Sequence, residues 1–348
     1  MTPLFKHILT IALALTIGCL NAQDLHFSQF MNAPLLTNPA NTGFLPNADY
    51  RLGANFRQQW ASVPVPFKTY SIWGDAQVFR NQFENGWLGL GGSIFSDVAG
   101  RGNLTTTKIM GNIAYHQMLG EHSLVSAGFT GGLVVKRINP TVFTWDNQWN
   151  GKFFNGALPT GETFSNNVTR YADIGFGLNY AYFPTENLYY NAGFSVAHAN
   201  QPSESFFSNN TTANYDAKVK PRYTFFANGS FKLNNNVIVN PNVYISTQSR
   251  ASEIVLGGTV NYNLKQNATD NTELFGGLYY RINDAIVPTV GVLYKNIRLA
   301  VSYDFTLSNN LASFNKLRGG NELNLTRLGF YNTTNKDTRK VGCFSPAF

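Results

Sequence analysis

The sequence predicts an all-β protein: a transmembrane antiparallel β-barrel of about 14 strands with a short N-terminal periplasmic plug segment. The first observation is that only 13% of the 348 residues are charged, about half of what soluble domains usually carry. The second is an aromatic content of 14% together with 31 glycines. The third is an alternation of apolar and polar residues that recurs from residue 50 to residue 331. In a membrane barrel only every second residue faces lipid, so these properties occur together.

The chain begins with the features of a secretory signal peptide. Lys6 supplies a positive charge, residues 8–20 form an apolar stretch, and the chain then turns polar. The apolar stretch is too short to span a bilayer. We expect cleavage after Ala22, which removes residues 1–22 and leaves Gln23 as the first residue of the mature chain.

The two cysteines and the net charge say little about the fold. An alternative to cleavage after residue 22 is a lipoprotein acylated at Cys19, although the three preceding residues fit a lipoprotein signal poorly. Cleavage leaves Cys343 alone, so no internal disulfide is expected. The net charge is +7, but the basic residues are dispersed rather than clustered. A nucleic-acid partner is therefore not expected.

The strands are predicted from the period-two pattern. Within residues 298–305, every second side chain from Leu299 onward is apolar, and the others, such as Arg298 and Asp304, are small or polar. Residues 171–182 repeat this pattern. Because every backbone group in lipid needs a partner, such a sheet must close. The predicted strands begin near residues 50, 68, 86, 104, 122, 170, 187, 222, 236, 252, 273, 285, 296 and 320.

These strands divide the mature chain into three parts: a periplasmic plug segment (23–49), the barrel (50–331) and a periplasmic C-terminal tail (332–348). With the N-terminus in the periplasm, the two longest connections, at about 136–169 and 199–221, fall outside the cell. The connections on the periplasmic side are tight turns, as is usual for such barrels. The rival fold is a soluble two-sheet sandwich, which would seldom need strands this long.

Two prolines conflict with the strand pattern. Pro241 and Pro288 fall within predicted strands, and a closed sheet has no free edge to accommodate them. Each therefore predicts a bulge or a strand boundary that is wrong by a few residues. The alternation also slips near residues 327–328, in the last strand.

The polar face of the strands should line the barrel lumen and carry charges of both signs. We favour lumenal ion pairs that brace the barrel over a solute-selective pore. The expected lumenal network consists of Arg51, Arg57, Asp75, Asp173, Arg281, Arg298, Asp304 and Glu322, with Asn55 on the same face.

The segment before the first strand is too apolar for a free tail. It contains Phe27 and Phe30, and two prolines prevent a long helix. We expect it to pack into the periplasmic mouth as a small plug, with a tight turn at Asn38-Pro39-Ala40. The alternative is a simple tether to the first strand.

The longer outer connection contains a group of aromatic residues: Trp145, Trp149, Phe153 and Phe154. Aromatic side chains at this density indicate packing or binding. One interpretation, slightly favoured, is that the loop folds over its own barrel mouth. The other is a docking surface for a secreted cargo protein.

Catalytic, cofactor and metal sites are not expected. The mature chain has four histidines, none of them in a recognisable triad motif. His116 and His122 flank a tight turn, and we expect both to be surface residues rather than a metal pair. A barrel hydrolase is therefore disfavoured.

Several motifs follow one another in the mature chain. They read QDLHFSQF (23–30), PLLTNPANTG (34–43), YR (50–51) and NFRQQW (55–60), and later SYDFTLS (302–308). In order and spacing they resemble the PorP/SprF family, which reads roughly QDxxFSQF, PLxxNPAxTG, YR, NYRxQW and SYDxTxS. Asn321 departs from the family's GSHE motif, and the ending CFSPAF (343–348) has extra residues between cysteine and proline.

The resemblance implies a non-enzymatic outer-membrane protein of the Bacteroidetes type IX secretion and gliding machinery. The implied partners are outer-membrane lipid, a large secreted surface protein with a type IX C-terminal domain, and periplasmic ring components or an OmpA-like peptidoglycan-binding lipoprotein. We therefore expect a scaffold for secretion and surface attachment of cargo of the gliding-adhesin type. The alternative is a passive porin or hydrophobic-solute channel, because Asn-Pro-Ala plugs are also similar to those of fatty-acid transporters.

Overall fold

The computed structural model describes residues 27–46, 48–60, 65–161, 166–206, 217–266, 271–308 and 318–331. The expected signal peptide (1–22) and C-terminal tail (332–348), which contain Cys19 and Cys343, lie outside the described residues.

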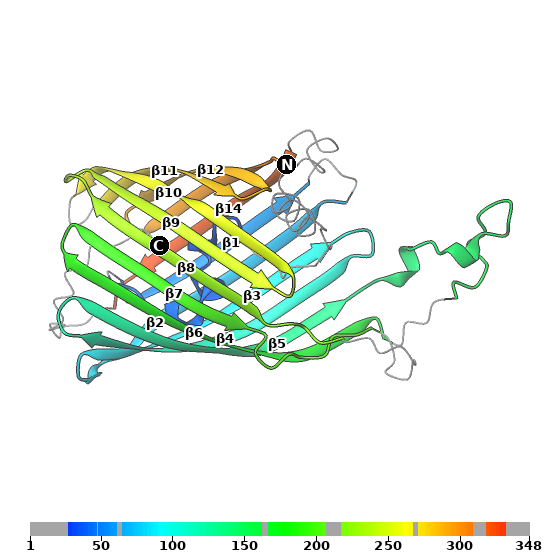
Figure 1. The fold of residues 1–348 in the computed structure, drawn as a ribbon, viewed down its shortest axis with the longest axis horizontal. Helices are drawn as coiled ribbons and strands as arrows, with labels where there is room; N and C mark the ends of the chain where they lie inside the picture. Colours follow the sequence, from blue (N-terminus) through cyan, green and yellow to red (C-terminus); the bar gives the residue numbers. More distant parts are fainter. Residues whose placement is uncertain are drawn as a thin grey trace, which may run out of the picture.

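Within the described residues, fourteen strands close into one antiparallel barrel (Figure 1), as the sequence predicted. Each strand pairs with its neighbours in the sequence, and β1 closes the sheet by pairing with both β2 and β14. The strands are β1 (Tyr50–Gln59), β2 (Phe67–Phe83), β3 (Gly86–Ala99), β4 (Leu104–Leu119), β5 (Ser123–Arg137), β6 (Val168–Thr185), β7 (Leu188–Ala197), β8 (Arg222–Lys232), β9 (Val237–Gln248), β10 (Ala251–Gln266), β11 (Asn271–Arg281), β12 (Ala285–Tyr294), β13 (Ile297–Thr306) and β14 (Arg318–Gly329).

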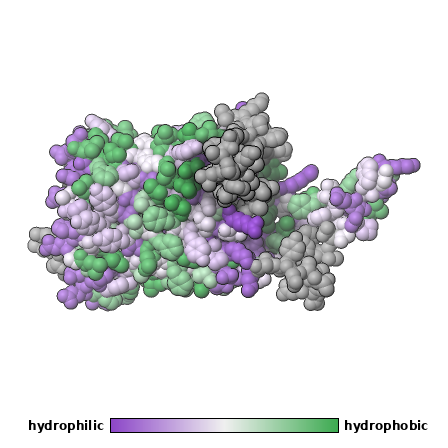
Figure 2. All heavy atoms as spheres, viewed as in Figure 1, coloured by the Kyte–Doolittle hydropathy of each residue, from purple (hydrophilic) through white to green (hydrophobic). Residues whose placement is uncertain are grey.

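The alternation predicted from the sequence separates the two faces of the wall. In β13, Leu299 and Val301 are exposed on the outside, whereas Arg298, Ser302 and Asp304 are buried inside. Figure 2 shows hydrophobic side chains over the barrel wall and hydrophilic ones gathered at the end of the barrel drawn on the left. The outer face therefore suits lipid, and the inner face is polar.

The two ends of the barrel differ in their connections. Every even-numbered connection, from β2–β3 to β12–β13, has between two and four residues, and we call that end the short-turn end. The opposite end carries the β5–β6 and β7–β8 connections, and we call it the long-loop end. The β5–β6 connection projects far beyond the wall in Figure 1. This asymmetry agrees with the sequence prediction.

The expected bulges at the two strand prolines are absent, and both prolines lie inside strands. Pro241 of β9 pairs with Gly258 of β10 in continuous register. On the β8 side, pairing stops at Asn242 and resumes at Val239 without a register shift. Pro288 is accommodated in the same way, with an interruption on the β13 side alone. Each proline therefore disturbs one ladder locally, because it lacks one N–H, and the strand continues.

Residues 27–46, which we call the lumenal segment, lie inside the barrel. The segment consists of short helical turns: η1 (Phe30–Asn32), α2 (Pro34–Thr37) and η2 (Pro39–Asn41). Prolines begin α2 and η2, as suits the first position of a helix. Among the described residues, no helix is long and apolar enough to cross a membrane.

Candidate functional site

The lumenal segment extends from one end of the barrel towards the other. At the short-turn end, the N–H of Asp49, the residue before β1, donates to the carbonyl of Gly329 (2.8 Å). Towards the long-loop end, Ser28 contacts Arg57 and Asp304, which lie near the ends of β1 and β13. The segment therefore reaches through the lumen, which differs from the expected position in the periplasmic mouth.

Aromatic contacts explain why the segment reaches so far. The ring of Phe27 packs edge-on against Phe95 of β3, with centroids 5.9 Å apart. Phe30 stacks on Tyr244 of β9 at 4.8 Å and meets Tyr279 of β11 edge-on at 6.2 Å. All five rings are buried, so the apolar side chains that excluded a free tail find their partners on the inner wall.

The turn at Asn38-Pro39-Ala40 is pressed against the wall. The Asn38 Oδ1 accepts from the N–H of Ala40 (2.8 Å), which caps η2. The Nδ2 of Asn38 donates to the carbonyl of Leu178 in β6 (2.9 Å) and approaches that of Phe194 in β7 (3.4 Å). Asn38 thus joins the turn to two strands, and both Asn38 and Ala40 are fully buried.

Glycines on the inner face make room for this turn. A Cβ atom at Gly128 of β5 would lie 2.4 Å from the backbone of Pro39 and Ala40. A Cβ at Gly177 of β6 would lie 1.9 Å from Asn38 Oδ1. Neither contact is sterically possible, so the close approach of segment and wall requires glycine. The contact of these glycines with the turn was not predicted, and the only signal for it in the sequence is their position on the inward face of predicted strands.

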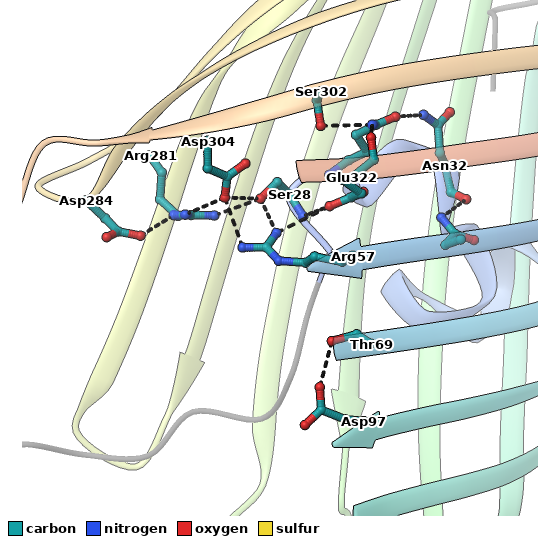
Figure 3. A network of polar contacts seen from close by, with 12 residues as sticks. Ser28, Asn32, Arg57, Thr69, Asp97, Arg281, Asp284, Ser302, Asp304 and Glu322 are labelled. Carbon is teal, nitrogen blue, oxygen red and sulfur yellow. Dashed lines mark hydrogen bonds and ion pairs between the residues drawn. The ribbon is translucent and has the colours of Figure 1, made fainter. Parts of the chain in front are cut away.

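A polar cluster fixes the start of the segment at the long-loop end (Figure 3). The Arg57 guanidinium forms ion pairs with Asp304 (2.9 Å) and Glu322 (3.3 Å), and all three side chains are buried. The Ser28 Oγ donates to Asp304 Oδ2 (2.7 Å), and Arg57 contacts the same hydroxyl. Arg281 adds a second cation, 3.0 Å from Asp304.

Glu322 also binds the backbone of the segment. Its two carboxylate oxygens accept from the N–H groups of Ser28 (2.8 Å) and Gln29 (3.0 Å). The Gln29 side chain donates to Ser302 of β13 (2.9 Å). Ser28 and Gln29 therefore complete the charged cluster. Their role was not predicted from the sequence, although both belong to the opening motif.

A second polar cluster fixes the other end of the segment. Arg51 of β1 and Asp75 of β2 form a two-pronged ion pair at 2.8 and 2.9 Å, with both side chains buried. Asp75 also accepts from the N–H of Gly43 (2.7 Å), and Arg51 donates to the carbonyl of Asn41 (3.0 Å). Charged hydrogen bonds of this kind are among the stronger contacts in proteins.

The remaining members of the expected lumenal network lie apart from these clusters. Asp173 pairs with His198 Nδ1 at 2.9 Å, and Arg298 lies over the ring of Phe275 at 3.9 Å. Asn55, also expected on this face, donates to the carbonyl of Asn32 at 3.1 Å. The eight charged residues expected in the lumen therefore form separate groups rather than one network.

His116 is not a surface residue, contrary to the sequence-based expectation. It points inward from β4, fully buried, and its ring stacks on Trp87 with centroids 4.9 Å apart. Its Nδ1 lies 2.7 Å from Ser126 Oγ, and its Nε2 lies 2.8 Å from the carbonyl of Thr42 in the lumenal segment. The alternation continues to the end of β4, so nearness to a turn did not bring this side chain to the surface. His122 is exposed, as expected.

The aromatic residues of the β5–β6 loop lie away from the barrel. Trp145 is partly buried against Phe143 (5.9 Å), whereas Trp149, Phe153 and Phe154 are exposed. The loop extends outward from the barrel (Figure 1). This differs from the slightly favoured expectation, in which the loop folds over its own barrel mouth. At its tip, polar backbone groups are satisfied within the loop, for example the carbonyls of residues 156 and 158 by the side chain of Gln148 (3.3 Å each). The loop tip therefore holds its shape without resting on the wall.

The described part of the chain holds no cluster of three or more His, Cys, Asp or Glu side chains that could bind a metal ion. The arrangement in the lumen is one of fixed ion pairs and hydrogen bonds between a chain segment and a barrel wall.

Comparison with known proteins shows which solved structures share this fold. No curated protein matches the sequence. Among solved structures, the chain is similar to the Pseudomonas putida toluene transporter TodX, with 12% identity over 85% of this chain and 92% of that chain and a TM-score of 0.50. It is also similar to the Ralstonia pickettii toluene transporter TbuX, with 13% identity over 86% and 94% of the two chains and a TM-score of 0.49. Identity this low shows a shared fold alone, that of an outer-membrane β-barrel.

The family comparison is more specific. The model of the family described as type IX secretion system membrane protein PorP/SprF matches residues 20–326, which include the whole lumenal segment and nearly the whole barrel. The chain therefore belongs to the PorP/SprF family of type IX secretion system membrane proteins.

Proposed function

We propose that this protein is a closed outer-membrane scaffold of the type IX secretion apparatus, which holds cargo and machine components and conducts no solute through its lumen. The observation that carries the proposal is the lumenal segment, which is bound by buried ion-pair clusters towards both ends of the barrel. A segment held in this way acts as a permanent plug.

The energetics support a plug that stays in place. Removing the segment would take Ser28 and Gln29 away from Glu322, and Gly43 away from Asp75. Each carboxylate would then lose hydrogen bonds to backbone N–H groups inside the barrel. Losing a partner of a buried charged group costs about 1–3 kcal/mol or more. Several such losses together make spontaneous opening rare.

The long-loop end is the surface proposed for cargo. Because such barrels place their short turns in the periplasm and their longer loops outside, we place this end outside, where it presents Trp149, Phe153 and Phe154. Exposed aromatic side chains are typical anchors of protein interfaces. The proposed cargo is a large secreted protein with a type IX C-terminal domain, of the gliding-adhesin type.

The short-turn end is the surface proposed for the machine. Its connections are short, and the last strand, β14, ends there. The proposed partners there are periplasmic ring components or an OmpA-like peptidoglycan-binding lipoprotein. Two separate docking surfaces on one rigid barrel would couple cargo to the machine.

Affinity purification tests this proposal. The tagged mature chain is recovered from solubilised outer membranes, and co-purifying proteins are identified by mass spectrometry. We expect ring components together with one large surface protein. The triple variant Trp149→Ser, Phe153→Ser, Phe154→Ser should lose the surface protein and keep the ring components. Recovery of the barrel alone, from membranes in which the machine is intact, would contradict the scaffold.

A further inference from the structure

A small enclosed cavity lies beside the lumenal segment, on the side away from the Asn38 turn. It has a volume of about 30 Å³ and lies between residues 29–32 and the inner faces of β8 to β13. Its lining includes Asn228, Asn242, Thr289, Phe275 and Arg298. A space of this size holds one or two water molecules or one small ion.

Arg298 brings a positive charge to this cavity without an ion-pair partner. Its side chain is 6% exposed, and its guanidinium lies over the ring of Phe275 at 3.9 Å. Arg51, Arg57 and Arg281 each form a buried ion pair, whereas Arg298 forms none with any residue that the structure describes. A buried charge is normally compensated by a partner of opposite charge.

Two other ionisable groups face Arg298 from β11. Glu273 exerts an electrostatic attraction on Arg298 without forming an ion pair, and its carboxylate accepts from Asn261 Nδ2 at 2.8 Å. The hydroxyl of Tyr279 accepts from Asn242 Nδ2 at 3.3 Å. The Glu273 carboxylate does not contact the guanidinium, and the Tyr279 hydroxyl is neutral. The charge of Arg298 is therefore compensated at a distance only.

Polar atoms without partners in the described part of the chain surround the same space, the amide oxygens of Asn228, Asn240 and Asn242 as well as several donors. The Nε of Arg298, the Nδ2 of Asn228 and the hydroxyl of Thr289 are buried and have no hydrogen-bond partner among the described residues. All three residues line the cavity. Water could accept from these donors, but water would leave the guanidinium of Arg298 without a negative charge in contact with it.

We propose that this cavity binds a small monovalent anion, either a halide or a carboxylate of formate size. The anion accepts from Arg298, Asn228 and Thr289 and neutralises the guanidinium. Because Gln29 and Asn32 form the opposite side of the cavity, the bound anion also joins the start of the lumenal segment to the β8–β13 wall. This inference does not depend on the proposed scaffold function, since it concerns a site inside the barrel.

The test is the anion dependence of thermal unfolding of the purified barrel in detergent. Chloride or bromide replaces gluconate, which is too large for the cavity, at constant sodium concentration and ionic strength. The wild type should show a saturable rise in its unfolding midpoint, on the order of a few degrees. Arg298→Gln should show none, whereas Arg318→Gln, at an exposed strand end, should respond as the wild type does.

A second variant keeps the test valid if Arg298→Gln does not fold. Asn228→Asp places a carboxylate in the cavity without breaking a hydrogen bond, so its unfolding midpoint should be insensitive to the added anion. Crystals grown in bromide should show an anomalous peak within hydrogen-bond distance of Arg298. The proposal is overturned if the wild type shows no response, if Arg298→Gln responds equally, or if the bromide peak is absent from the cavity.

Discussion

The lumenal segment and the β5–β6 loop are similar in composition and opposite in environment. Both are irregular and rich in aromatic residues, and each contains one short helical turn that begins with Asn-Pro. Phe27 and Phe30 of the segment are 4% and 5% exposed, whereas Trp149 and Phe153 of the loop are 56% and 59% exposed. The aromatic side chains of the lumenal segment pack against the barrel wall. Trp149 and Phe153 of the loop pack against no comparable surface among the described residues.

The polar contacts of the two regions differ in the same way. The backbone of the segment donates to carboxylates of distant strands, as Ser28 does to Glu322. At the loop tip, backbone groups bond within the loop, as the carbonyls of residues 156 and 158 do with the side chain of Gln148. We therefore expect changes in the segment to alter barrel stability and closure, and changes in the loop tip to alter binding.

The largest effect is expected from Arg57→Ala. This change leaves the buried carboxylates of Asp304 and Glu322 with less compensation, which costs about 3–5 kcal/mol. The matched control is Lys136→Ala. Lys136 pairs with Glu204 at 2.6 Å with both side chains 23% exposed, and the loss of such a pair costs about 0–1 kcal/mol. Urea unfolding in detergent measures the free energy of unfolding of both variants, and equal losses would contradict the structural role of the polar cluster around Arg57.

The next effect is expected from Gly128→Val, which forces the segment away from β5. The new side chain would overlap the backbone at Pro39 and Ala40, and overpacking of this kind costs about 1–3 kcal/mol. Gly276→Val is the control, because a Cβ there has no neighbour within 4 Å. The segment's displacement can be followed by protease sensitivity between residues 27 and 46. If the segment were as well protected from protease in Gly128→Val as in Gly276→Val, its close contact with β5 would not be needed to hold it.

A smaller effect is expected from Asn38→Ala, and the loop offers a direct counterpart. Asn38 and Asn139 both cap a short helix by accepting from the N–H two residues later. Loss of such a cap costs about 1 kcal/mol. Asn38 additionally binds the carbonyl of Leu178 in β6, so Asn38→Ala should cost about 1–3 kcal/mol more than Asn139→Ala. Equal unfolding free energies for the two variants would mean that this wall contact adds nothing.

The smallest effect on stability is expected from replacing Trp149, Phe153 and Phe154 with serine. Exposed side chains away from packed regions change stability by about 0.5 kcal/mol or less. The same variant should lose most of its cargo in affinity purification. A folded triple variant that retains its cargo would remove the loop from the proposed docking surface.

The barrel itself could be predicted because lipid and lumen impose a simple period on the sequence. Predicted strand starts agree with the structure to within about two residues, as for β2, β8 and β14. The bulges predicted at Pro241 and Pro288 are absent, because a local interruption of one ladder is less disruptive than a bulge. His116 was predicted at the surface because it lies near a turn, but strand alternation places it inside the barrel.

The contents of the lumen could be predicted only in part. The apolar residues before the first strand indicated a plug, and the inward charges were identified from alternation. Their pairing could not be foreseen, because Ser28 and Glu322 lie 294 residues apart in the sequence. The site on the wall that receives the Asn38 turn could not be predicted either, because glycines of different strands form it together. Which charges meet is decided by register and by the path of the segment.

The central claim is that the lumenal segment closes the barrel, and single-channel recording tests it most directly. Purified wild-type protein is inserted into planar bilayers and its current is compared with that of Gly128→Val and Gly276→Val. We predict no stepwise current above background for the wild type and Gly276→Val, and resolvable steps for Gly128→Val. Steady conductance of the wild type, with the segment in place, would contradict the closed scaffold and favour a passive channel.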